Sequence, residues 1–239
     1  MINGKRVITI LPVLNEEDKI MHIVAKASGD LVDELLVVDD ASTDDTANEA
    51  RKGGATVLTN ENRAGCGASI RIGIDYALAR RYDIIAVMAG NGKDDGRDLP
   101  ALLNGLENGF DFVQGSRYLE GGVWENMPLH RVIGTKAYSV LFSLLNRLWI
   151  TDATNGFRAY RASLFDDKRI NIWQEWLTNY EVESYLFSKS IRLGYRVGEV
   201  PVSKIYPPSL ALGYTKMKPF VDWWRHFRPS LLLALHLKS

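Results

Sequence analysis

Short aliphatic runs alternate with segments of helical periodicity through the first half of the chain. Three continuous runs rich in Val, Ile and Leu span residues 7–11, 35–38 and 84–88. Such runs are typical of strands that are covered on both faces. Apolar residues recur at helical spacing in the segments 19–27, 46–52 and 68–80. This alternation predicts an α/β fold with a mostly parallel central sheet flanked by helices.

The second half of the chain is less regular. Residues 112–114 and 197–202 read as further strands, and residues 132–149 and 181–193 read as long helices that pack beside the sheet. After residue 208 the chain becomes aromatic and basic. Because no linker or break in composition separates these parts, we expect residues 1–239 to form a single domain.

Composition excludes several classes of protein. The chain has 239 residues, of which 46% are hydrophobic, and its 29 basic and 29 acidic side chains cancel. This balance argues against disorder and against a basic nucleic-acid-binding module. Cys66 is the only cysteine, which fits a reducing compartment. The apolar runs, such as 231–235, are far below the roughly 20 residues that cross a bilayer, and no signal peptide is expected. We therefore expect a cytoplasmic protein.

Polar loops follow the three aliphatic runs. They span residues 12–16, 39–45 and 89–96. In open α/β sheets, ligands bind beyond the carboxyl ends of the strands. We expect these three loops to line one crevice.

Asp39 and Asp40 follow the second run directly. Two adjacent carboxylates repel each other unless a cation or a hydrogen-bond donor lies nearby, and a nucleobase N–H or a ribose hydroxyl would serve. Thr43 and Asp44 have the alternative role of capping the next helix.

Six motifs occur in order along the chain. They are Pro12-x-x-Asn15-Glu16, Val37-Val38-Asp39-Asp40-x-Ser42-x-Asp44-x-Thr46, Asn62-Arg63-x-Gly65-x-Gly67-Ala68, Gly115-Ser116-Arg117-Tyr118, Asp152-x-Thr154-x-Gly156-Phe157-Arg158 and Gly194-Tyr195-Arg196-Val197-x-Glu199-Val200-Pro201. Together they resemble family 2 glycosyltransferases of the GT-A fold. The resemblance extends from about residue 6 to residue 202 and is greatest to the polyprenyl-phosphate branch, the dolichol-phosphate mannose synthase type.

The resemblance implies a nucleotide-diphosphate sugar as donor. It divides the chain into a nucleotide-binding half (about 1–115), an acceptor-binding half (about 116–205) and an aromatic and basic helical segment (about 206–239). The residues that it places at the nucleotide are Pro12, Asn15, Glu16, Asp39 and Asp40, together with the late basic residue Lys216 near the donor phosphates. Carboxylates suit this task because they accept hydrogen bonds from imide N–H groups and from paired hydroxyls.

One family motif is absent. The family holds a divalent cation, Mg²⁺ or Mn²⁺, on the donor diphosphate with an Asp-x-Asp, and this chain has Ala89, Gly90 and Asn91 there. Ala89 has no ligand atom and Asn91 offers a single neutral oxygen, so Asn91 is at best a weak metal ligand. Lys93 adds a fixed cation close by.

Three interpretations of this departure stay open. In the first, the ammonium of Lys93 does part of the metal's work on the departing diphosphate, and transfer is independent of metal. In the second, Asp94 and Asp95 hold a displaced metal, whereas their structural role would be to pair with Lys93 and to cap the helix that begins near Asp98. In the third, the protein is a catalytically silent nucleotide-sugar binder.

The acceptor side follows the family more closely. The resemblance places Arg117, Arg131 and Thr135 around the phosphate of a lipid acceptor. Two guanidinium groups and a hydroxyl suit a phosphate. Asp152 belongs near the donor sugar or the acceptor, with a structural ion pair to Arg158 as the alternative.

The acceptor decides whether a base is needed. A phosphate is already ionised near neutral pH, so it attacks without a strong general base. For a hydroxyl acceptor, a carboxylate would have to remove a proton, and the candidates are Asp94, Asp95, Asp152, Glu181 and Glu183.

The sequence thus predicts an inverting glycosyltransferase that moves a sugar from a nucleotide-diphosphate sugar to an acceptor. A polyprenyl phosphate is the first choice of acceptor, and a soluble hydroxyl acceptor is the alternative. A nucleotidyltransferase is a rival from another class, but no glycine-rich basic loop follows the first strand.

Residues 216–237 are aromatic and basic. Helical spacing puts several apolar residues on one face of a helix that Pro229 is expected to end, and these are Met217, Phe220, Val221, Trp224 and Phe227. This face either packs in the core or contacts a membrane surface, since Trp and basic residues favour the headgroup region. In the second case the protein is peripheral at the inner face of the membrane.

Overall fold

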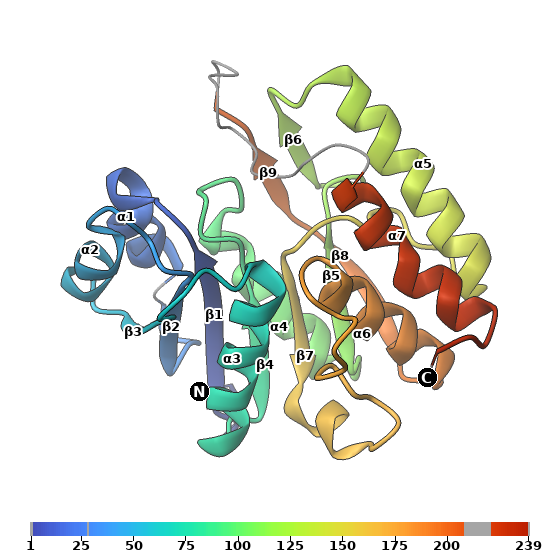
Figure 1. Ribbon diagram of the computed structural model, residues 1–239, viewed down its shortest axis with the longest axis horizontal. Helices are drawn as coiled ribbons and strands as arrows, with labels where there is room; N and C mark the ends of the chain where they lie inside the picture. The colour runs from blue at the N-terminus through green and yellow to red at the C-terminus, as the bar shows by residue number, and fades with distance from the viewer. Residues whose placement is uncertain (1, 28, 208–220, 239) are drawn as a thin grey trace.

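A seven-stranded sheet runs through the structure, a computed structural model that describes residues 2–27, 29–207 and 221–238 (Figure 1). The order of its strands is β3-β2-β1-β4-β7-β5-β8. The strands are β1 (Val7–Val13), β2 (Glu34–Asp39), β3 (Thr56–Thr59), β4 (Ile84–Val87), β5 (Phe112–Ser116), β7 (Arg158–Arg161) and β8 (Val197–Pro201). A second, two-stranded sheet pairs β6 (Val123–Glu125) with β9 (Ser203–Ile205).

The large sheet is mostly parallel, as predicted. Strands β1, β2, β3 and β4 pair in parallel, and so do β5 and β8. Strand β7 is the exception, because it pairs antiparallel with both β4 and β5. The chain between β5 and β7 begins and ends at the same edge of the sheet, so β7 enters without a crossover to the opposite edge. Its sequence, Arg-Ala-Tyr-Arg, has no continuous apolar run, and it was not predicted.

Helices cover both faces of the sheet (Figure 1). They are α1 (Glu17–Ala27), α2 (Thr46–Lys52), α3 (Cys66–Ala79), α4 (Leu99–Glu107), α5 (Leu129–Asn146), α6 (Glu181–Arg192) and α7 (Val221–Ala234). Strand β1 shows how the faces divide. Its Val7 and Leu11 pack in one core cluster with α1, α2 and α4, while Ile8 and Ile10 pack in another with α3, α5 and α6. Both faces are therefore buried, as expected for continuous aliphatic strands.

The predicted end of the last helix was wrong, and so was the core-packing alternative for its apolar face. Helix α7 continues through Pro229, and its buried residues are Asp222, His226, Pro229, Ser230 and Leu233. Val221 and Trp224, which core packing would have buried, are each 52% exposed. The neighbouring helix explains this difference. Ser230 contacts Ser188 of α6, and their hydroxyl oxygens lie 2.7 Å apart. Small polar side chains therefore make the helix contact for which apolar side chains were expected. Met217 and Phe220 lie outside the described residues.

Within residues 2–27, 29–207 and 221–238, no helix is long and apolar enough to cross a bilayer.

Candidate active site

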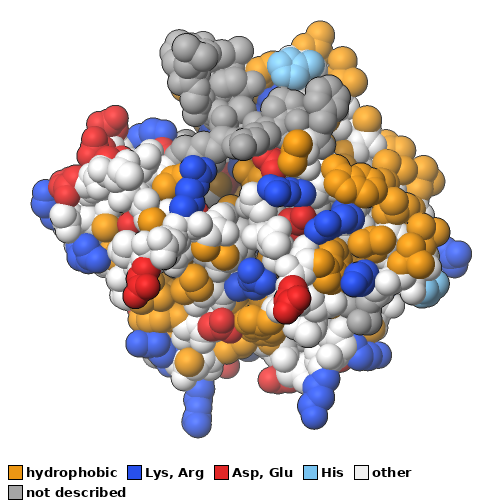
Figure 2. Space-filling model, in the orientation of Figure 1, with side chains coloured by type: hydrophobic (Ala, Val, Ile, Leu, Met, Phe, Trp, Pro, Cys, Tyr) orange, Lys and Arg blue, Asp and Glu red, His pale blue; other side chains and the backbone are white. Residues whose placement is uncertain are grey.

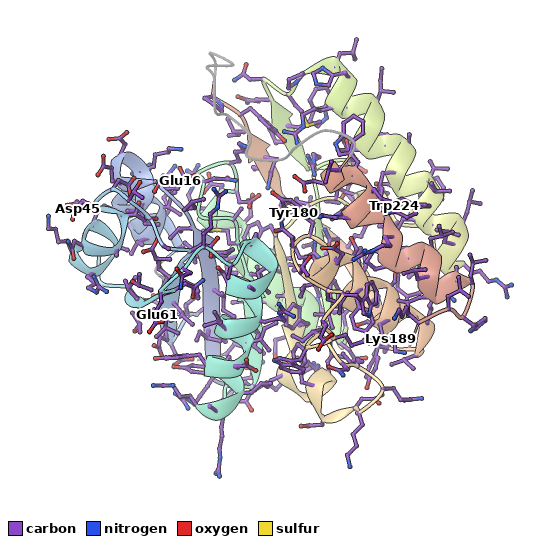
Figure 3. All side chains as sticks on the ribbon, in the orientation of Figure 1. Glu16, Asp45, Glu61, Tyr180, Lys189 and Trp224 are labelled. Carbon is purple, nitrogen blue, oxygen red and sulfur yellow. The ribbon has the colours of Figure 1, made fainter. Side chains whose placement is uncertain are left out.

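A cavity of about 690 Å³ lies where the loops after β1, β2 and β4 meet the second half of the chain. Figure 3 shows Glu16 near α1 and Trp224 on α7 on opposite sides of this region, with Tyr180 between them. The predicted site residues that line the cavity are Pro12, Glu16, Asp40, Asn91, Lys93, Arg117, Arg131 and Thr135. The three polar loops thus contribute to one crevice, as expected.

Glycine allows the two halves to close on each other beside this cavity. Gly67 lies in the first turn of α3, and a Cβ atom there would fall 2.0 Å from the carbonyl oxygen of Asn179. Backbone therefore packs on backbone at this point, and a larger residue would push α3 away from the segment before α6. Asn179 and Tyr180 of that segment line the cavity.

Asp40 faces the cavity and also orders the loop before α3. Its Oδ1 accepts hydrogen bonds from Nδ2 of Asn60 (3.0 Å) and from the backbone N–H of Ala64 (2.8 Å). Its Oδ2 accepts from the backbone N–H of Gly65 (2.9 Å). Carboxylate oxygens have about four lone-pair sites in total, so Asp40 keeps accepting capacity for a ligand. Asp39, in contrast, accepts from the backbone N–H and the hydroxyl of Ser42 and does not line the cavity.

Asn15 ties two of the loops together rather than lining the cavity. Its backbone N–H donates to Oγ of Ser42 (2.9 Å), and its Oδ1 accepts from the backbone N–H of Thr43 (2.9 Å). Glu16 is buried in the cavity wall, where it accepts from Nζ of Lys19 (2.5 Å). Lys216 lies outside the described residues.

The residues at the position of the family's metal do not fit a divalent cation. The side chain of Asp94 is fully buried, and its Oδ1 lies 2.5 Å from Nζ of Lys204. Its Oδ2 accepts from the backbone N–H of Ala89 (3.1 Å), and Oδ1 of Asn91 accepts from the backbone N–H of Lys93 (3.2 Å). Throughout residues 2–27, 29–207 and 221–238, no three His, Cys, Asp or Glu side chains are grouped to hold a metal.

Asp95 lies away from the cavity. Its carboxylate accepts from the backbone N–H of Arg97 (3.0 Å) and pairs with the Arg97 guanidinium, with Oδ2 2.5 Å from Nη2. It therefore caps the short 3-10 turn Gly96–Asp98, as the capping role considered for it predicted, but its ion-pair partner is Arg97 and not the predicted Lys93.

Lys93 and Lys204 both line the cavity. Lys93 is buried with its Nζ 5.0 Å from the ring centre of Tyr206. Burial lowers the pKa of Lys93 to about 8, and the neighbouring charges of Lys204 and Arg131 act in the same direction. Lys204, which was not predicted as a site residue, belongs to the short strand β9. It donates to Asp94 and to Oδ1 of Asn155 (3.2 Å). Its sequence neighbours carry no motif that would have singled it out.

The ion pair of Asp152 differs from the expected one. Its Oδ2 lies 2.6 Å from Nε of Arg117 and its Oδ1 lies 3.1 Å from Nη2, so Asp152 pairs with Arg117 and not with Arg158. Arg158 instead lies 3.4 Å from Glu183. Asp152 is fully buried and does not line the cavity, whereas Arg117 does. The carboxylate thus positions the guanidinium at the cavity wall.

Arg131 and Thr135 lie one turn apart near the start of α5, and both line the cavity. Oγ1 of Thr135 lies 2.6 Å from the phenol oxygen of Tyr118, and the guanidinium of Arg131 lies 5.8 Å from the ring centre of Tyr206. Residues four apart on a helix share a face. The predicted phosphate-binding residues are thereby brought together with Arg117.

Glu183 is the one carboxylate of the five base candidates that lines the cavity. Burial raises its pKa, while the guanidinium of Arg158 opposes the shift. Glu181, two residues earlier, pairs with Arg228 at 2.9 Å. The structure therefore narrows the choice of base for a hydroxyl acceptor to Glu183.

The mostly parallel sheet, with a cavity at its carboxyl-end loops lined by acidic and basic side chains, has the GT-A fold. More narrowly, the chain belongs to glycosyl transferase family 2, whose profile matches residues 9–168. The resemblance found in the motifs is thereby confirmed.

The relatives include enzymes of the polyprenyl-phosphate branch. Polyprenol monophosphomannose synthase of Mycolicibacterium smegmatis is 31% identical over 206 residues, which cover 83% of this chain and 77% of that protein. Undecaprenyl-phosphate mannosyltransferase of Micrococcus luteus is 32% identical over 219 residues, which cover 89% of this chain and 87% of that protein.

A solved structure shares the fold at lower identity. Glucosyl-3-phosphoglycerate synthase from Mycobacterium tuberculosis, in complex with Mn²⁺, uridine diphosphate and glucosyl-3-phosphoglycerate, superposes with a TM-score of 0.69. It is 22% identical, and the match covers 99% of this chain and 82% of that one. Structures of that enzyme thus hold Mn²⁺ with uridine diphosphate.

Proposed function

We propose that the protein transfers a sugar, with inversion, from a nucleotide-diphosphate sugar to a polyprenyl phosphate. The observation that carries this proposal is the meeting of two groups of residues at one cavity. Asp40 and Glu16 lie on the donor side, and Arg117, Arg131 and Thr135 lie on the acceptor side. Relatives named for polyprenol and undecaprenyl-phosphate substrates support the choice of acceptor.

The reaction is a direct displacement at the anomeric carbon. The nucleotide lies in the loops after β1 and β2, and the diphosphate lies toward Lys93. A phosphate oxygen of the acceptor, held by Arg131 and Thr135, forms the new bond to the anomeric carbon from the face opposite the diphosphate. The bond between the anomeric carbon and the diphosphate oxygen breaks, and the nucleoside diphosphate leaves with the electron pair of that bond. An acceptor phosphate is ionised at neutral pH, so no general base is required.

Lys93 acts on the departing diphosphate in place of part of a metal ion's charge. Its ammonium donates hydrogen bonds and carries a positive charge close to the cavity, as a phosphate-binding lysine does. Ala89 and Asn91 supply no carboxylate that would hold Mg²⁺ or Mn²⁺. Asp40, Glu16 and Pro12 hold the nucleoside, and the donor half of the chain is thus about residues 1–115.

The acceptor half carries a surface suited to a membrane. Leu129 and Leu144 of α5 are 73% and 71% exposed, Trp149 just after α5 is 69% exposed, and Trp223 and Trp224 of α7 are also exposed. Figure 2 shows hydrophobic side chains gathered over the side where Figure 1 places α5 and α7, with basic side chains nearby. Exposed Trp, aliphatic and basic residues favour the interface of an anionic bilayer. We place the protein there as a peripheral protein of the inner membrane face, which would bring Arg131 close to lipid headgroups.

A soluble hydroxyl acceptor is the second candidate, and one observation favours it. Glu183 lines the cavity with a raised pKa, as a general base would. The M. tuberculosis enzyme of the same fold has glucosyl-3-phosphoglycerate bound, which is a soluble molecule.

A transfer assay separates the candidates. The protein is incubated with radiolabelled GDP-, UDP-, CDP- or dTDP-sugars and a polyprenyl phosphate in vesicles, and then the mixture is partitioned between organic and aqueous phases. We expect one donor to give label in the organic phase, in a product of inverted anomeric configuration. Label that appears only in an aqueous glycoside would favour the hydroxyl acceptor. Binding of a donor without any transfer would identify a silent binder and contradict the proposal.

A further inference from the structure

We propose that the ammonium of Lys204, held by Asp94 and Asn155, occupies the place of the family's divalent cation and binds the donor diphosphate together with Lys93. The inference rests on the proposed function only in taking a nucleoside diphosphate as the ligand. It assigns Asp94 a role different from acid–base chemistry, since the carboxylate becomes the counter-ion of a built-in cation.

The position of Asp94 is the first support. Its Oδ2 accepts from the backbone N–H of Ala89, the residue that stands where the family has the first aspartate of its Asp-x-Asp. A carboxylate is therefore present beside that position, but it comes from five residues further along the chain. Its other oxygen lies 2.5 Å from Nζ of Lys204, the distance of a short charge-assisted hydrogen bond.

The backbone fixes this pair. Asp94 and Lys204 form an antiparallel bridge, and the backbone N–H of Ile205 donates to the carbonyl of Lys93 (2.8 Å). Lys93, in the turn before Asp94, is therefore held by backbone pairing beside β9, the strand that carries Lys204. Both line the cavity.

Charge and donor capacity also match the task. Two ammonium groups and one carboxylate leave a net charge of about +1 at the site, so the diphosphate meets positive charge without a metal. An ammonium has three N–H donors. Among the described residues, Asp94 and Asn155 take two from Lys204, and the third remains for a phosphate oxygen.

A divalent cation would have to displace Lys204 to reach Asp94. It would then find one carboxylate and the neutral amide oxygens of Asn91 and Asn155, which is a poor ligand set for a hard cation in the presence of a competing ammonium. Removal of the ammonium reverses this competition, because it leaves the Asp94 carboxylate buried without its partner.

The test measures binding of a nucleoside diphosphate by calorimetry, in the presence of chelator and in the presence of Mn²⁺, with the diphosphate that stabilises the protein most. We expect the unchanged protein to bind with the same affinity, within about threefold, in both conditions. Lys204→Ala should bind about 10- to 100-fold more weakly in chelator, and Mn²⁺ should restore most of the loss. The double variant Lys204→Ala/Asp94→Asn should bind weakly in both conditions. Lys189→Ala, on α6 and away from the cavity (Figure 3), is the control and should behave like the unchanged protein.

Two results would overturn the inference: affinity of the unchanged protein that collapses in chelator and returns with Mn²⁺, or full affinity of Lys204→Ala in chelator. Lys204→Arg keeps a cation at the site, and it should remain insensitive to metal with an affinity within about tenfold. This variant keeps the test decisive if Lys204→Ala does not fold, because metal-dependent binding by Lys204→Arg would also contradict the inference. Since no acceptor is present, failed transfer with intact metal-independent binding would count against the proposed acceptor alone. A protein that binds no nucleoside diphosphate would contradict the proposed donor.

Discussion

Arg131→Gln is expected to lower kcat/KM for a polyprenyl phosphate about 100-fold, which corresponds to about 2.7 kcal/mol of transition-state stabilisation. Arg131 and Thr135 face the cavity from adjacent turns of α5. Hydrogen bonds to charged groups contribute about 1.5–3 kcal/mol, and glutamine keeps a polar side chain but removes the charge and shortens the reach. The loss should therefore fall on use of the acceptor.

Steady-state kinetics with a fixed donor concentration measures this effect. The matched control is Arg147→Gln, which removes the same charge from an exposed position at the other end of the same helix. It should leave kcat/KM within about threefold of the unchanged protein. Slow hydrolysis of the donor without acceptor should change little in either variant. Equal rates for Arg131→Gln and the unchanged protein would show that the acceptor phosphate lies elsewhere.

Asp152→Ala is expected to lower the free energy of unfolding by about 3–5 kcal/mol. Asp152 accepts hydrogen bonds from the backbone, Nε and Nη2 of Arg117 and from Thr154. Both side chains of the ion pair are almost fully buried. Alanine would leave the guanidinium in the protein interior without a counter-ion, which costs more than the loss of a surface pair.

Urea unfolding followed by circular dichroism gives this free energy. Glu107→Ala is the control, because it breaks the partly exposed pair with Lys5, and exposed pairs are worth about 0–1 kcal/mol. If Asp152→Ala unfolds like the unchanged protein but loses transfer activity, the carboxylate acts on the substrates, as one interpretation of the sequence held, and its role beside Arg117 is secondary.

The first half of the fold, apart from β3, could be predicted because its signals are local. Aliphatic runs mark β1, β2 and β4, and the polar turns that follow them sit at the edge where parallel strands place ligands. The positions of Glu16, Asp40 and Lys93 just after these runs were therefore enough to predict that they line the cavity. The family motifs added Arg117 and Arg131, which local spacing alone would not have paired with them.

The remainder depends on contacts between distant parts of the chain. Strand β7 is a short Arg-Ala-Tyr-Arg segment that becomes a central strand only because β4 and β5 lie on either side of it. Asp152 pairs with Arg117, 35 residues away in the sequence, rather than with Arg158. Lys204 pairs with Asp94, 110 residues away. Neither pairing has a spacing that predicts it. Helix α7 buries Ser230 against Ser188 of α6 and His226 against Tyr138 of α5, and apolar periodicity alone did not predict which residues would be buried.

A crystal structure with a bound nucleotide-diphosphate sugar would show whether the polar loops hold a donor. We expect the base beside Pro12 and Asp40, and diphosphate oxygens about 3 Å from Nζ of both Lys93 and Lys204. An empty cavity at saturating donor, or a diphosphate that lies away from both lysines, would contradict this description of the site.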